Sequence, residues 1–137
     1  MIEKIIHKNK ELAIVIRNNY NKEGVNFVTP ESCTLQVGML CHKKGKKIEP
    51  HVHKNVIRTV NRVLEVLHLE EGKIDVDFYI NGNIVKTCTL EEGDTIILLS
   101  GGHGFRVQED TKMIEVKQGP YLSQAEDKEM IETKEKF

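Results

Sequence analysis

The chain has 137 residues, with 20 basic and 21 acidic side chains and a formal net charge of −1 at pH 7. This length predicts one domain with one hydrophobic core, and the interspersed charges of both signs argue against a nucleic-acid partner. The sequence has no run of eighteen apolar residues and no signal peptide, so we expect a cytoplasmic protein that does not enter a membrane. Three cysteines without a CxxC pair agree with reduced thiols in the cytosol.

Apolar and polar residues alternate with a period of two along most of the chain, which is typical of half-buried strands. The pair Asn81-Gly82 is the strongest hairpin signal, because it favours the two-residue turn between antiparallel strands. We expect strands at residues 12–17, 25–29, 34–42, 63–69, 74–80, 83–90, 95–99, 105–107 and 112–117. Short strands separated by turns predict an all-β sandwich or barrel.

The end of the chain has a different character and forms a charged tail at residues 123–137. Residues 123–126, Ser-Gln-Ala-Glu, match a capping box, which predicts a short helix. Two alternatives stay open: this helix packs on the barrel or on a partner subunit, or the terminus is frayed. We therefore assign residues 1–122 to the β-domain and residues 123–137 to the tail.

Three residues suggest a metal site. His51 and His53 lie two residues apart, so on a strand both imidazoles would point to the same face. Glu65 interrupts an apolar row that includes Leu67 and Leu69, and a buried carboxylate is normally paired or bound to a metal. The alternatives are surface histidines, a solvated glutamate at an edge, or an ion pair between Glu65 and a nearby arginine.

The spacing of these residues also resembles a family signature. Gly45-x5-His51-x-His53, followed by Glu65-x6-Gly72, resembles the first motif of the cupin superfamily. Gly93-Asp94, an apolar run, Gly101 and His103 resemble the second motif. The resemblance covers residues 34–119 and implies a cupin-type jelly-roll β-barrel. It also implies one divalent first-row transition metal (iron, manganese, zinc or nickel), held by His51, His53, Glu65 and His103.

The chain departs from the family pattern at two places. Eleven residues, 54–64, separate His53 from Glu65, where the family usually has three or four. In the second motif Leu99 stands where the family usually has proline, and only Gly102 lies between Gly101 and His103. The insertion at residues 54–64 is basic and starts directly after one expected ligand.

Two kinds of side chain are candidates for contact with a ligand. Glu115 shares a strand face with Met113 and Lys117, so it is either a second carboxylate near the metal, acting as general acid or base, or part of a solvated face. Arg58 and Arg62 lie in the insertion, and guanidinium groups bind carboxylates and phosphates in a bidentate way. The insertion would then bind an anionic ligand; the alternative is a hydrated surface loop.

The resemblance implies a small metal-binding cupin that acts on a small polar molecule of sugar type. It is similar to stand-alone cupins of bacterial carbohydrate and surface-polysaccharide metabolism. If the protein is an enzyme, metal-assisted isomerisation or epimerisation fits, and oxygen-dependent chemistry on non-haem iron is the rival reaction class. A non-catalytic ligand-binding module is the alternative outside catalysis. Apolar residues on both faces of the strand at 63–69 predict a homodimer.

Overall fold

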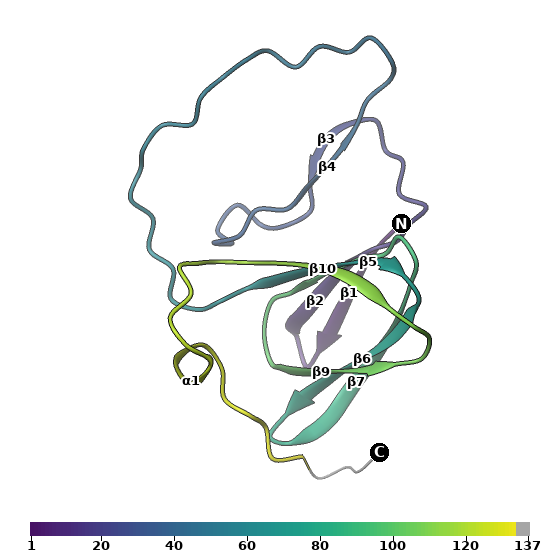
Figure 1. Ribbon diagram of the computed structural model, residues 1–137, viewed down its shortest axis with the longest axis vertical. Coiled ribbons are helices and arrows are strands. Elements are labelled where there is room, and N and C mark those ends of the chain that lie inside the picture. Colours follow the sequence, from purple (N-terminus) through teal and green to yellow (C-terminus); the bar gives the residue numbers. More distant parts are fainter. Residues whose placement is uncertain (134–137) are drawn as a thin grey trace. The chain divides into compact units, whose positions relative to one another are not determined.

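The computed structural model describes residues 1–133, which form antiparallel β-strands and one short helix (Figure 1). The predicted all-β class is confirmed. The described elements are β1 (Ile2–His7), β2 (Lys10–Ile16), β3 (Gly24–Phe27), β4 (Gly38–Cys41), β5 (Glu65–Glu71), β6 (Lys73–Ile80), β7 (Asn83–Glu91), β8 (Thr95–Leu98), β9 (Gly102–Val107), β10 (Lys112–Lys117) and α1 (Gln124–Asp127). The strands form three sheets, which do not close into a barrel.

The chain divides into two compact units. The main unit consists of residues 1–20 together with the chain from Val63 onward, and the inserted unit consists of residues 21–62. The main unit contains a five-stranded sheet in the order β1-β2-β8-β5-β10 and a three-stranded sheet in the order β7-β6-β9. The inserted unit contains the two-stranded sheet of β3 and β4.

The hydrophobic core of the main unit lies between its two sheets. Leu67 and Leu69 contribute from β5, while Val76 and Phe78 contribute from β6. The other buried members of this core are Leu12, Ala13, Val15, Ile74, Cys88, Leu90, Ile96 and Leu98. The alternation seen in the sequence therefore places one side of each sheet in a shared core.

Two turns of the main unit depend on glycine or asparagine. Asn81 and Gly82 join β6 to β7 with φ angles of 52° and 75°, which confirms the predicted two-residue hairpin. Gly72 joins β5 to β6 with a φ of 93°, and a Cβ at this position would meet the backbone carbonyl of Asp110. Only glycine fits a positive φ combined with such a close backbone approach.

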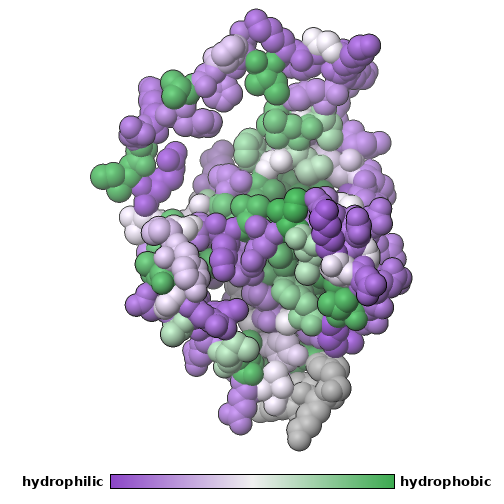
Figure 2. Space-filling model, in the orientation of Figure 1, coloured by the Kyte–Doolittle hydropathy of each residue, from purple (hydrophilic) through white to green (hydrophobic). Residues whose placement is uncertain are grey.

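The inserted unit has almost no core of its own. Thr29 is its single buried residue, at 6% exposure. Eight large apolar side chains are exposed: Val25, Phe27, Leu40, Ile48, Val52, Val56, Ile57 and Val60. Figure 2 shows hydrophobic side chains at the surface of this thin segment of chain. The two cysteines of this unit, Cys33 and Cys41, are free, so no disulfide joins its strands.

The tail contains the predicted helix in shortened form. The Ser123 hydroxyl accepts a hydrogen bond from the backbone N–H of Glu126 at 3.1 Å, which is the expected cap of α1. Further along, Ile131 lies against Gly102 of β9. Residues 134–137 of the predicted tail lie outside the described residues. In residues 1–133 no helix has the length and apolar character needed to cross a membrane.

Candidate functional site

Glu65 and His103 come together across the two sheets of the main unit. Glu65 begins β5 and shares the core-facing side with Leu67 and Leu69. His103 lies on β9 directly opposite the buried Phe78 of β6, so it faces the same inter-sheet space. The Oε2 atom of Glu65 lies 3.2 Å from Nε2 of His103, with side-chain exposures of 21% and 30% respectively.

The surroundings of Glu65 favour its ionised form. The hydrogen bond with His103 lowers the pKa of Glu65, and the partial burial of the carboxylate opposes this effect. The charges of His103 and Lys117 and a side-chain hydrogen bond with Glu115 lower the pKa further. Glu65 is therefore a carboxylate at neutral pH and is available as a ligand for a cation.

Glu115 and Lys117 lie beside Glu65 on the neighbouring strand β10. The register pairs Lys117 with Glu65 and Glu115 with Leu67. Because directly paired residues share a face, both side chains are on the core-facing side of the sheet. The register thus places the predicted acid–base residue Glu115 on the same face as Glu65, a predicted metal ligand. Lys117 lies on this face as well. The same alternation predicts its position, but the sequence analysis assigned it no role.

His51 and His53 lie in the inserted unit, where both are exposed and outside any strand. Their ring centroids are 5.3 Å apart in an edge-to-face arrangement. The Nδ1–H of His51 donates to the backbone carbonyl of Glu49 at 2.8 Å. This bond fixes the proton on Nδ1 and leaves the Nε2 lone pair of His51 available to a metal.

Arg58 and Arg62, the predicted ligand-binding residues, also lie in the inserted unit. Both side chains are exposed, and neither forms an ion pair with another described residue. Their guanidinium groups are therefore open to solvent or to a ligand.

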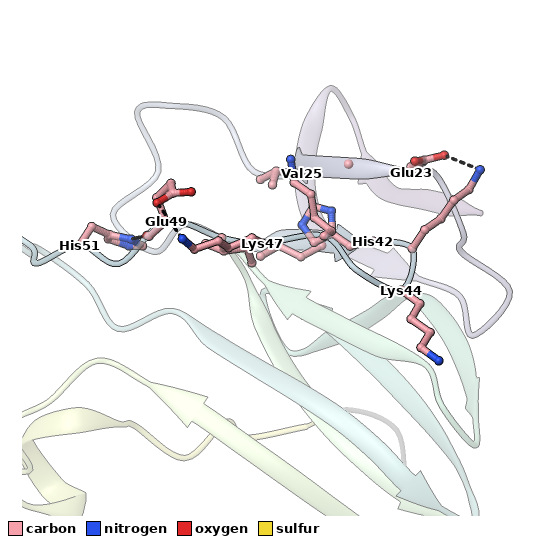
Figure 3. A pocket seen from close by; sticks show the side chains of 12 residues that line it. Glu23, Val25, His42, Lys44, Lys47, Glu49 and His51 are labelled. Atoms are coloured by element: carbon pink, nitrogen blue, oxygen red, sulfur yellow. Dashed lines mark hydrogen bonds and ion pairs between the residues drawn. The ribbon is translucent and has the colours of Figure 1, made fainter.

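The inserted unit also contains an open groove with a volume of about 780 Å³ (Figure 3). Four lysines line it, at positions 43, 44, 46 and 47, together with His42 and His51. Two of these lysines are paired: Lys43 lies 3.6 Å from Glu23, and Lys47 lies 3.6 Å from Glu49. The lysine run within residues 43–47 is the sequence signal for this groove.

The predicted metal ligands are thus two pairs, one in each unit. In neither unit do residues 1–133 bring together three or more His, Cys, Asp or Glu side chains able to hold a metal ion. The donors fit a first-row ion in their chemistry, since three imidazoles and one carboxylate suit iron, zinc, manganese or nickel. No protein-family model, curated protein or solved structure matches this chain.

Proposed function

We propose that this protein is a metal-binding protein of the cupin type, with His51, His53, Glu65 and His103 as ligands. The contact between Glu65 and His103 is the observation that carries the proposal. A carboxylate and an imidazole from facing sheets converge at the positions of the two family motifs. This pairing supplies two of the four donors on rigid strands, where ligand geometry is best controlled.

The other two ligands belong to the inserted unit in this proposal. His51 already has the tautomer that a metal needs, because its Nδ1–H is held by the Glu49 carbonyl. The inserted unit also carries far more exposed apolar surface than a stable isolated segment would. Recruitment of His51 and His53 to the metal would therefore order a segment that lacks its own core.

The jelly-roll architecture is part of the same proposal, and the sheet edges of the main unit support it. Strands β9 and β10 are edge strands in their sheets. They also carry exposed apolar residues, with Phe105 and Val107 on β9 and Ile114 and Val116 on β10. Unpaired backbone groups beside exposed apolar side chains at these edges leave room for the further strands that a closed barrel requires.

The proposed ligand is a small polar molecule of sugar type. When bound, the metal supplies Lewis-acid polarisation of a substrate carbonyl, which suits isomerisation or epimerisation of a sugar. Glu115 lies on the same face of the sheet as Glu65 and faces the inter-sheet space, so it is placed to move a proton at the substrate. Arg58 and Arg62 are exposed and form no ion pair with another residue among 1–133, and they would contact an anionic group of the same molecule.

Metal content provides the test. The purified protein, loaded with zinc, manganese, iron or nickel in turn and dialysed, is analysed by elemental mass spectrometry. We expect about one equivalent of metal per chain. His51→Ala combined with His53→Ala should remove this metal, while His42→Ala in the same unit and His68→Gln on the outer face of β5 should not. Equal metal content in the double variant and in the controls would refute the proposed site.

A further inference from the structure

A lysine at the end of β10 lies in the candidate site. Lys117 pairs directly with Glu65, and Met113 on the same face of β10 packs against the core. The side chain of Lys117 is therefore on the core-facing side of the sheet, although it is exposed at the end of its strand. Its charge contributes to the lowered pKa of Glu65, which agrees with this placement.

Lys117 differs from the other lysine of its strand in its partners. The ammonium of Lys112 pairs with the Glu70 carboxylate at 3.1 Å. Among residues 1–133, no carboxylate lies within ion-pair distance of the Lys117 ammonium. The two lysines lie at opposite ends of β10, where Lys112 pairs with Glu71 and Lys117 with Glu65. Lys117 therefore brings an uncommitted positive charge to a site that otherwise contains two carboxyl groups.

The side chains on the facing strand β9 describe the molecule that would fit. His103 and Phe105 face the same inter-sheet space from β9, with ring centroids 5.5 Å apart, and Phe105 is 37% exposed. A ligand there would meet one cation, a carboxyl group that hydrogen-bonds hydroxyls, and the face of an aromatic ring. Aromatic rings commonly cover the apolar C–H face of a ring-shaped ligand.

We infer that Lys117 binds a carboxylate group of the ligand, and that the substrate class is a polyhydroxylated carboxylic acid such as a sugar acid. Lys117 offers a single ammonium beside Glu65 and Glu115, which suits a singly charged carboxylate. The two carboxyl groups would repel a phosphate dianion more strongly than a carboxylate, because the repulsion grows with the charge of the ligand. This inference rests on the proposed function, because it assigns the ligand of the same site.

The test measures the affinity of the metal-loaded protein for three probes by isothermal titration calorimetry. The probes are glucuronate, glucose and glucose 6-phosphate. We expect glucuronate to bind more tightly than either of the others. Loss of a charge-assisted hydrogen bond in Lys117→Met should weaken glucuronate binding on the order of tenfold. Lys112→Met, at the other end of the same strand, should bind glucuronate like the wild type.

Metal content and melting temperature are measured for each variant, so that failure of the proposed metal site can be distinguished from failure of the proposed role of Lys117. Absence of metal from the wild type refutes the metal site, while the comparison of Lys117→Met with Lys112→Met still tests the lysine. Three results would overturn the inference itself. These are a wild type that does not bind glucuronate, glucose 6-phosphate binding at least as tightly as glucuronate, and unchanged glucuronate affinity in a folded Lys117→Met protein.

Discussion

The carboxylate of Glu65 lies 3.2 Å from the imidazole of His103, and the two residues belong to different sheets. Both side chains keep some exposure to solvent, so as an ion pair alone they contribute at most about 1 kcal/mol to the free energy of unfolding. A pair with so little effect on stability leaves both side chains available to a ligand.

Glu65→Gln should therefore separate a structural role from a ligand role. We expect the variant to lose most of its bound metal while its melting temperature in metal-free buffer falls by only a few degrees. Glu71→Gln, at the exposed end of the same strand, is the matched control and should change neither quantity. A large fall in melting temperature with full metal content would instead identify a structural ion pair.

The inserted unit offers a test that does not depend on a substrate. Lys54, Arg58 and Arg62 are exposed and lie in a stretch without regular secondary structure, which is the kind of segment that trypsin cleaves. If metal recruits His51 and His53, cleavage at these three sites should become several-fold slower with metal than with EDTA. Mass spectrometry of the fragments over time measures each site separately.

Cleavage after Lys128, in the tail, serves as the internal control for protease activity and should be equal in both buffers. If all four sites are cut at unchanged rates in a protein that demonstrably binds metal, the histidines of the inserted unit are not ligands.

Much of the main unit could be predicted from alternation and turn chemistry alone. Strands β6 and β7 and the Asn81-Gly82 turn agree closely with expectation, because hairpins are local and their register is set by the turn. Strand β1 was missed. Its side chains alternate between exposed and half-buried positions, but its apolar residues Ile2, Ile5 and Ile6 do not follow a period of two in the sequence.

The candidate site was predictable to a different degree in each unit. Alternation is enough to place Glu65, Glu115 and Lys117 on one face, because β10 pairs with β5 in unbroken register from Met113 to Lys117. His51 and His53 lie outside any strand, so the rule that residues i and i+2 share a face does not apply to them. Where such a segment packs depends on long-range contacts, which a local pattern does not encode.

A buried ion pair on the three-stranded sheet should matter for stability. Asp77 is 1% exposed and accepts hydrogen bonds from Arg106 at 2.6 and 2.8 Å and from the Thr87 hydroxyl at 2.7 Å. Asp77→Ala leaves the Thr87 hydroxyl and the guanidinium without this acceptor. Because the Arg106 side chain stays 35% exposed, we expect a loss of about 2 kcal/mol in urea unfolding, below the range for a fully buried pair.

The same aspartate predicts a pH dependence. The hydrogen bond with Arg106, aided by Thr87, lowers the pKa of Asp77 in the folded state against the effect of burial. Its stabilising contribution is therefore complete above the unfolded-state pKa of about 4 and is lost as the pH falls through the lower folded-state value. Asp77→Asn should make the free energy of unfolding less dependent on pH below about 4. An unchanged dependence of the free energy of unfolding on pH in that range would contradict the lowered pKa of Asp77.

The outer face of β10 predicts that the protein forms a homodimer. Ile114 and Val116 are 48% and 51% exposed, and the register places Val116 directly opposite Val66 of β5. These side chains form an apolar row on the face opposite Glu115 and Lys117, so a partner there would not block the candidate site. A two-fold axis lets one such row pack against its own copy, which makes a second copy of this chain the simplest partner.

Light scattering at micromolar concentration should give twice the chain mass for the wild type and the single chain mass for Ile114→Glu combined with Val116→Glu. Lys86→Glu, an exposed change on the other sheet, should remain dimeric. A wild-type protein that is monomeric under these conditions would refute the dimer, and a dimer that survives the double substitution would place its interface on another face.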